Sequence, residues 1–418
     1  MRMGATEDAA SRRPEPTLDM DAHRESGSVG GDQRAHRPVL VLGLLPAGLA
    51  FARSLGRAGI PVHGGVFRGH EFGLRSRYLR SRCVAVDARE EERDRRMLAF
   101  LRTLSAGERT ILVPERDEHV DFVLRNWDEV RASADVPLPA DPEIVRRLRR
   151  KDLLPAAAAE AGIAAPGTRA MLGPETLAEG ALEPPYLLKP VEGQEFALMF
   201  GKKAAVAETD EKALVVWQEA NAHGFELILQ ELVPDSHEQV FSLFTYVGRD
   251  GEPLASVVGR KVRQGPLRFG TSAVFETKFD PEVLELGLRL LRTVGYRGFA
   301  HVEFALDPRD GAYKVLEVNT RLPVWAGIAM KRSFDIGRVA YDDLSGIATA
   351  PREPLQEDLA WVYLAKDLWV SAQMARRREL SIRGFLSHHV RTGKVGAVFA
   401  ADDPLPALAS VGYLRSRL

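Results

Sequence analysis

The chain has a single cysteine, Cys83, in 418 residues. One thiol excludes an intramolecular disulfide framework and is typical of a reducing compartment, so we expect a cytoplasmic protein. Long hydrophobic runs are also missing. The longest, residues 38–52, is too short for a bilayer and is interrupted by Gly43, Pro46 and Gly48. The sequence therefore predicts neither a disulfide scaffold nor a membrane protein.

The chain also has no large excess of positive or negative charge. The chain has 57 basic and 58 acidic residues and a net charge of -1, so no global field attracts nucleic acid. Residues 1–37 have few aliphatic side chains and no apolar signal core, which predicts a disordered tail and not a targeting segment. The rest of the chain has room for two or three domains with a substantial core.

Residues 38–142 alternate between short apolar segments and amphipathic ones. Strands are expected at 39–43, 60–66, 82–86 and 110–113, with helices at 46–58 and 90–104. This alternation predicts a parallel α/β sheet. Gly43 and Gly48 lie where a dinucleotide-binding fingerprint would begin, but the G-x-G-x-x-G spacing is absent. We interpret them as packing glycines in a strand-to-helix turn.

A second unit is expected at 143–347, followed by a C-terminal extension at 348–418. In the second unit, helices are predicted at 146–161 and 281–294, and strands at 186–190, from about 203, and at 225–233, 239–247 and 254–262. The last three are expected to be antiparallel. One helix is predicted in the extension, at about 359–377.

Residues 299–321 predict a β-hairpin. Two stretches rich in β-branched and aromatic residues alternate with period two, and a Pro-Arg-Asp-Gly turn separates them. If Asp307 faces Tyr313 across the turn, Glu303 falls directly opposite Glu317. The other face is then apolar and is predicted to be core: Val302, Phe304 and Leu306 against Leu316 and Val318.

The polar face of this hairpin suggests a metal site. Like charges directly opposite one another destabilise a strand pair, so Glu303 facing Glu317 favours a cation between them. His301 falls opposite Asn319 in the same register. Two carboxylates and an amide are oxygen ligands suited to a hard ion, above all Mg²⁺, with phosphate oxygens completing its shell. An ordinary exposed hairpin with two surface glutamates is the alternative.

Basic residues stand at positions where solvation alone is a poor explanation. Lys189 ends the apolar strand Tyr-Leu-Leu-Lys-Pro, and a buried ammonium needs a partner anion unless it reaches out to water. Arg260 and Lys261 end a predicted strand, where a charged edge strand is the usual explanation. Arg321 lies two residues beyond Asn319 and could bind a phosphate or carboxylate in bidentate fashion.

The order and spacing of several segments resemble the ATP-grasp superfamily, and more closely the D-aspartate ligase-like group of carboxylate–amine ligases. The resemblance covers roughly residues 39–346. The segments are Leu188-Lys189-Pro190, Phe200-Gly-Lys-Lys203, Gln230-Glu231-Leu-Val-Pro234, Gly259-Arg-Lys-Val-Arg-Gln264, Phe269-Gly-Thr271, Gly295-Tyr-Arg-Gly298, Val302-Glu-Phe304 and Leu316-Glu-Val-Asn319. No single segment is a strong motif, but unrelated chains would rarely reproduce all of them in order.

The resemblance implies a Rossmann-like N-terminal domain at 38–142 and a two-subdomain ATP-grasp fold at 143–347, with its lid at about 155–232. It also implies the cofactors ATP and Mg²⁺. The implied ATP-binding residues are Lys151, Lys189, Lys202, Lys203, Glu231, Val233 and Glu238. The implied metal ligands are Glu303, Glu317 and Asn319, while Arg260, Lys261 and Arg321 would neutralise the transferring phosphoryl group. The segment 192–201 has fewer glycines than the usual phosphate-covering loop, so we expect Lys202 or Lys203 to take its place.

The implied activity is an ATP-dependent ligase that joins a carboxylic acid to an amine through an acyl phosphate. Small acids and amines, such as amino acids or peptides, are the expected partners, and a homodimer is left open. A ligase of specialised small-molecule biosynthesis instead of cell-wall synthesis is one alternative, and a non-catalytic nucleotide-binding protein is another. Asp117, Glu118 and His301 are weaker candidates for substrate contact. Asp117 and Glu118 follow a strand of the parallel sheet, where open α/β folds bind ligands, but a capping Asp and a solvated Glu explain them equally well.

Overall fold

The computed structural model describes residues 36–86, 89–178, 180, 182–191, 196, 199–201, 203–234, 240–331, 333–390 and 393–415. The predictions for the tail at 1–35, for Lys202 and for Glu238 lie outside these residues. Arg37, which was assigned to the tail, lies inside them. Its guanidinium is 2.5 Å from Asp135 and donates to the carbonyl of Leu344 at 2.5 Å.

The N-terminal domain is built on the predicted parallel sheet, with strand order β3-β2-β1-β4-β5. The strands are β1 Val39–Leu42, β2 Val62–Val66, β3 Leu79–Val84, β4 Thr110–Pro114 and β5 Ala134–Asp135. The helices are α1 Pro46–Arg57, η1 Phe72–Arg75, α2 Glu90–Leu104, α3 Asp117–Arg125 and α4 Trp127–Ser133. The third strand begins at Leu79 and not at Arg82, because its pairing with β2 starts there.

The turn between β1 and α1 confirms that its glycines serve packing. A Cβ on Gly48 would come within 2.0 Å of the carbonyl oxygen of Gly43. The backbone N–H groups at the start of α1 have no partner within the helix. The side chain of Glu115 accepts hydrogen bonds from those of Leu45, at 2.9 Å, and Ala47, at 3.1 Å. A helix N-terminus is a natural phosphate site. In this protein the side chain of Glu115 occupies the position that a phosphate would take at this helix N-terminus.

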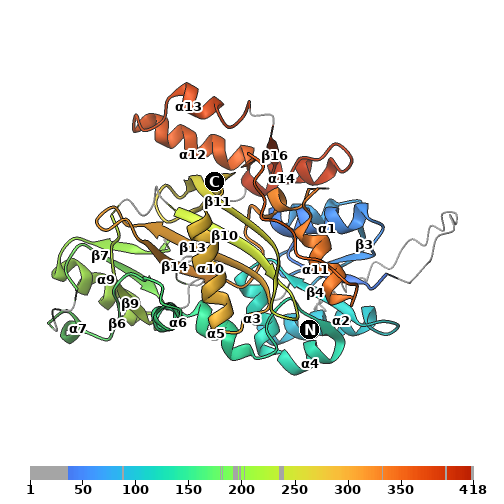
Figure 1. The fold of residues 1–418 in the computed structure, drawn as a ribbon, viewed down its shortest axis with the longest axis horizontal. Helices are drawn as coiled ribbons and strands as arrows, with labels where there is room; N and C mark the ends of the chain where they lie inside the picture. The colour runs from blue at the N-terminus through green and yellow to red at the C-terminus, as the bar shows by residue number, and fades with distance from the viewer. Residues whose placement is uncertain are drawn as a thin grey trace, which may run out of the picture.

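The residues predicted as the lid form an antiparallel sheet of order β6-β9-β7-β8, which lies at one end of the molecule in Figure 1. Its elements are β6 Thr168–Met171, α7 Pro174–Ala178, β7 Tyr186–Pro190, β8 Ala205–Ala207, α9 Asp210–Ala222 and β9 Leu227–Glu231. The single helix predicted at 146–161 is wrong. The chain forms α5 Pro142–Arg149 and α6 Leu154–Glu160, and Lys151 lies in the turn between them. Pro155 is tolerated in the first turn of α6 but would break a continuous helix.

The central sheet has the order β14-β13-β10-β11-β12-β15-β16 and is antiparallel except for its last pair. Its strands are β10 Val240–Val247, β11 Pro253–Gly265, β12 Thr271–Thr277, β13 Gly298–Leu306, β14 Tyr313–Asn319, β15 Ala360–Val362 and β16 Lys394–Gly396. The remaining elements are α10 Pro281–Thr293, η2 Ala326–Ala329, α11 Ile336–Leu344, α12 Leu364–Arg376, α13 Ile382–Leu386 and α14 Leu405–Arg415.

The C-terminal extension is part of this architecture. Residues 360–362, predicted as helix, form strand β15, because they pair with β12 and bury all three side chains. Helix α12 follows and packs on β11 and β12, while α14 contacts η1 of the N-terminal domain (Figure 1). Asp403, just before α14, accepts hydrogen bonds from Arg53 at 2.9 Å and from Ser76 at 2.7 Å, and all three groups are buried.

One apolar core joins the N-terminal domain to the central sheet. The ring of Phe51 on α1 meets Phe299 on β13 edge to face, and Trp325 stacks on Phe275 at 3.7 Å. All four rings are almost fully buried. The N-terminal domain is therefore packed on the face of the central sheet that carries Phe299 and His301. Within the residues described, no helix is long and apolar enough to cross a membrane.

Candidate active site

The hairpin of β13 and β14 has the predicted pairing at its far end: His301 faces Asn319, and Glu303 faces Glu317. The assumption behind this prediction was wrong, because Leu306 and not Asp307 pairs with Tyr313. A bulge between the two ends corrects the one-residue difference.

The bulge also changes the apolar face. Val315 pairs with Phe304 and is buried, whereas Leu316, predicted as core, is only partly buried. Asp307 is freed from pairing and is fully buried at the turn, where Lys314 holds its carboxylate at 2.7 Å. The carboxylate pair therefore sits on a rigid, well-anchored hairpin.

The two glutamates have different surroundings. The Lys261 ammonium lies 3.3 Å from Glu303, and although burial acts in the opposite direction, this charge holds the pKa of Glu303 well below its usual range. Among the described residues, no hydrogen-bonding or ion-pair partner is present for the carboxylate of Glu317. Glu303 is therefore ionised at neutral pH, and Glu317 retains free oxygen atoms for a ligand.

His301 is buried beside this pair. Its ring meets Trp325 edge to face at 5.4 Å, and its Nε2 lies 3.5 Å from Glu303 without a hydrogen bond in the described structure. Its Nδ1 lies 3.5 Å from the side-chain nitrogen of Asn319. Burial lowers the pKa of His301 to about 4, so the imidazole is neutral at neutral pH.

Lysines from the lid side approach the same carboxylates. Lys189 on β7 donates to Gln230 at 2.8 Å. Burial lowers its pKa to about 8, against the attraction of Glu317. Lys151 repels Lys189 and donates to the carbonyl of Val191 at 3.4 Å. The predicted pair Lys151 and Lys189 is thus brought together beside the hairpin.

Lys203 comes from just before β8 and is solvent-exposed. Loss of surrounding water lowers its pKa, and the next strongest influences are the charges of Glu317, Arg321 and Lys261. Lys203 therefore lies close enough to the hairpin for the charges of Glu317 and Arg321 to act on it.

Arg321 joins the hairpin to the N-terminal domain. Its guanidinium binds both oxygens of Asp117, at 2.9 and 2.7 Å, and donates to Oδ1 of Asn319 at 2.9 Å. Asp117 is the first residue of α3, and despite burial the adjacent Arg321 lowers its pKa far below the ordinary value. The weaker candidate Asp117 therefore lies next to two residues of the predicted site.

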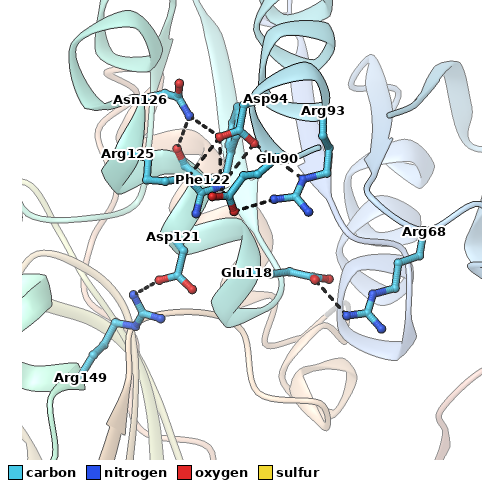
Figure 2. Close-up of polar contacts among 10 residues, drawn as sticks. All are labelled: Arg68, Glu90, Arg93, Asp94, Glu118, Asp121, Phe122, Arg125, Asn126 and Arg149. Carbon is cyan, nitrogen blue, oxygen red and sulfur yellow. Dashed lines mark hydrogen bonds and ion pairs between the residues drawn. The ribbon is translucent and has the colours of Figure 1, made fainter. Parts of the chain in front are cut away.

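Glu118 binds Arg68 at 3.2 Å (Figure 2) and also pairs with Arg116. Figure 2 also shows Asp121 on α3 bound to Arg149 at 2.6 Å. Arg149 lies at the end of α5, and its other nearby carboxylate is Asp117 at 3.9 Å. Glu118 is thus engaged within the N-terminal domain, while Asp117 and Asp121 tie α3 to the second unit.

Two predicted site residues have partners elsewhere. Arg260 donates to Glu276 on β12 at 2.6 Å. The carboxylate of Glu231 accepts from the backbone N–H of Gly167 at 3.0 Å and also binds Arg309, so it joins the lid to the hairpin turn. Val233 is buried just beyond β9. Adenine contact by Glu231 would have to come from its backbone, and it stays a prediction.

A network around Asp94 lies apart from these residues. Asp94 on α2 binds Arg125 at 3.0 Å and the side chain of Asn126 at 3.0 Å (Figure 2). A hollow of about 460 Å³ beside it is lined by Glu90, Glu91, Asp94, Arg95, Leu98, Arg102, Arg125, Asn126 and Glu129. Most of the charged groups there pair with one another, so we interpret the network as a link between α2 and α3.

Sequence reasoning missed one cation. Lys366 on α12 lies beyond the region of family resemblance, in a helix without any recognisable motif. The charges of Lys203 and Lys261 act on its ammonium, and its contact with Thr271 lies next to the contact of Lys261 with Gly270. Nothing in its local sequence separates it from a solvated lysine.

The overall architecture is that of the ATP-grasp fold, which confirms the fold predicted from the sequence. The family description "Carbamoyl-phosphate synthase L chain, ATP binding domain" matches residues 263–333, the region of the hairpin. A solved N5-carboxyaminoimidazole ribonucleotide synthetase in complex with ADP superposes with a TM-score of 0.61 at 15% identity, covering 82% of this chain and 85% of that one.

Among characterised proteins, the chain is similar to the D-aspartate ligase of Enterococcus faecium (strain Aus0004), with 28% identity over 160 residues. This match covers 35% of the chain and 38% of that enzyme. A match to the carbamoyl phosphate synthase large chain of Mycobacterium tuberculosis, at 30% identity, covers 31% of the chain and only 10% of that protein. The L-amino acid ligase of Bacillus licheniformis has a TM-score of 0.56 at 13% identity and covers 75% of each chain.

Proposed function

We propose that the protein is an ATP-dependent carboxylate–amine ligase that forms an amide bond through an acyl phosphate. The observation that supports this most strongly is the position of Glu303 opposite Glu317, with lysines of the lid and an arginine of the hairpin around them. The names of two relatives, a D-aspartate ligase and an L-amino acid ligase, support the same class of reaction.

The charges around the hairpin favour a polyphosphate ligand. In the described part of the chain, the cations whose charges act on the pair include Lys189, Lys203, Lys261 and Arg321, and Lys151 and Lys366 lie beside these, whereas the carboxylates are those of Glu303, Glu317 and Asp117. Such an excess of positive charge is costly unless a ligand brings negative charge. A nucleoside triphosphate is a ligand of this kind.

The donor set also suits Mg²⁺. Described residues include no cluster of three or more His, Cys, Asp and Glu that could hold a metal. The protein's proposed contribution is two carboxylates and one amide, from Glu303, Glu317 and Asn319. Glu317 has free oxygens, Glu303 is ionised, and Oδ1 of Asn319 accepts a hydrogen bond from Arg321. When bound, Mg²⁺ would neutralise phosphate charge, and phosphate oxygens would complete its coordination.

The residues of the chain would divide the remaining work. Lys151 and Lys189 hold the nucleotide phosphates, and the backbone around Glu231 and Val233 reads the adenine. Lys261 and Arg321 orient the terminal phosphoryl group and stabilise the charge that develops on it. Because His301 is neutral and buried, it holds the amide of Asn319 and does not supply a proton.

The reaction has two steps. An oxygen of the acid substrate attacks the terminal phosphorus, the bond to ADP breaks, and an acyl phosphate forms. The nitrogen of the amine then attacks the acyl carbon, phosphate leaves, and the amine loses a proton. The site needs to position and neutralise charge, and no nucleophilic side chain is required.

Isotope labelling tests this proposal. Candidate acids and amines, beginning with amino acids, are screened for amine-dependent phosphate release, and the active acid is then labelled with ¹⁸O in its carboxylate. One labelled oxygen should appear in inorganic phosphate, with ADP as the nucleotide product. AMP and pyrophosphate would refute the mechanism. ATP binding with no turnover over a broad screen would support a non-catalytic nucleotide-binding protein.

A further inference from the structure

Lys366 reaches the candidate site from outside the ATP-grasp core. It lies on α12 in the C-terminal extension, which passes over β11 in Figure 1. Its ammonium donates to the carbonyl oxygen of Thr271 at 2.9 Å and also contacts the Thr271 hydroxyl. The Lys261 ammonium contacts the carbonyl of the preceding residue, Gly270, at 3.4 Å. Two lysines from different elements therefore meet at consecutive residues of one loop.

The surroundings of Lys366 do not explain it as a structural ion pair. In the described ranges, no carboxylate lies within ion-pair distance of its ammonium. The charges that act on it are those of Lys203 and Lys261, both positive, and together with burial they lower the pKa of Lys366 to about 7. A half-buried ammonium with only positive neighbours destabilises the protein unless an anion arrives.

The backbone beneath Lys366 is held firmly. The next residue, Asp367, is fully buried and binds Arg263 of β11 through both oxygens, at 2.6 and 3.0 Å. His389 approaches the same carboxylate to 2.8 Å. Gly265 lies against the side chain, since a Cβ there would come within 3.2 Å of Cε of Lys366. This support gives the ammonium a defined position and not the freedom of a surface lysine.

We propose that Lys366 binds the terminal phosphoryl group of the nucleotide, so that the C-terminal extension supplies part of the site. The inference rests on the proposed function. Lys261 connects Lys366 to the predicted metal site. Its ammonium contacts Gly270, next to the residue that Lys366 contacts, and lies 3.3 Å from the carboxylate of Glu303. An anion held between Lys203, Lys261 and Lys366 is therefore next to the oxygens that would hold Mg²⁺.

The test compares a nucleotide with and without a terminal phosphoryl group. Wild type, Lys366→Met and Lys366→Gln are titrated by calorimetry with AMP-PNP and with ADP, each in excess Mg²⁺. Both variants should bind AMP-PNP at least about tenfold more weakly, because a charge-assisted contact is lost, and ADP less than about twofold more weakly. Lys366→Arg should retain most of the affinity for AMP-PNP.

Lys394→Met is the matched control, since Lys394 is an exposed lysine of the same extension. It should bind both nucleotides as wild type does. Thermal melting checks folding, and neither Lys366→Met nor Lys366→Gln should melt below wild type, because each relieves repulsion. Equal loss for both nucleotides, or no loss for either, would overturn the inference while the proposed function stands. A wild-type protein that binds neither nucleotide would overturn both.

Discussion

Replacing Lys189 by methionine should stabilise the free protein and lower its affinity for the nucleotide. Burial lowers the pKa of Lys189 from 10.5 to about 8, so the folded protein keeps this ammonium charged at pH 7 against an unfavourable environment. A shift of that size corresponds to roughly 3 kcal/mol. Methionine keeps the length of the side chain without the charge, and loses only the hydrogen bond to Gln230, worth about 1 kcal/mol.

The sign of the pH dependence follows from the direction of the shift. Between pH 8 and 10.5 the folded protein has lost the Lys189 proton, while the unfolded chain still holds it. Because the unfolded state binds more protons in this window, stability should rise with pH there. In Lys189→Met this contribution is absent. At pH 7 the variant should be more stable than wild type by about 1 to 2 kcal/mol. Removing the buried charge stabilises the folded state, and losing the hydrogen bond to Gln230 cancels part of that gain.

Nucleotide affinity should change in the opposite direction. Loss of a charge-assisted contact to phosphate costs roughly 1.5–3 kcal/mol, which raises Kd about 10- to 150-fold at pH 7. In the free wild-type protein only about one tenth of Lys189 is charged at pH 9, so binding must then take up a proton. The affinities of wild type and variant should approach each other as the pH rises.

Urea unfolding from pH 7 to 10 measures the stability, and calorimetry with MgADP in buffers of different ionisation enthalpy measures affinity and proton uptake. Lys212→Met is the matched control, because Lys212 lies on α9 and pairs with Glu208 in an exposed ion pair. It should change neither quantity. If Lys189→Met were less stable than wild type at pH 7, or bound MgADP equally well, the assignment of Lys189 as a buried phosphate ligand would be refuted.

Two further predictions test the hairpin and the C-terminal extension. Glu317→Gln should abolish nearly all ATP turnover, because it removes a proposed metal ligand. It should not lower the melting temperature in metal-free buffer, because it relieves repulsion with Glu303. Near-normal turnover would contradict the metal assignment. Asp403→Ala should cost roughly 3–5 kcal/mol in urea unfolding, because it leaves the buried Arg53 without its partner, and an effect below 1 kcal/mol would show that the contact between the extension and the N-terminal domain is dispensable.

The hairpin could be predicted from the sequence because strand alternation and a short turn limit the register to a few choices, but Glu303 faces Glu317 only because a bulge offsets the one-residue error at the turn. The bulge could not, since it depends on which of Val315 and Leu316 fits the core beneath β14. The break between α5 and α6 had a local signal in Pro155, which the basic run before it obscured. Strand β15 had none, because its three residues become a strand only by pairing with β12.

Local order along the chain thus determined the class of fold, the strands of the parallel sheet, the hairpin of Glu303 and Glu317 and the lysine at the end of β7, because each depends on neighbours within a few residues. Only the tertiary structure decided which groups meet across the site. Asp117 and Arg321 are separated by 204 residues and form a bidentate ion pair. Lys366 and Lys261 contact the neighbouring residues Thr271 and Gly270 because α12 packs on β11, which no motif records. Such contacts depend on how whole helices and strands pack, so the sequence around each residue does not predict them.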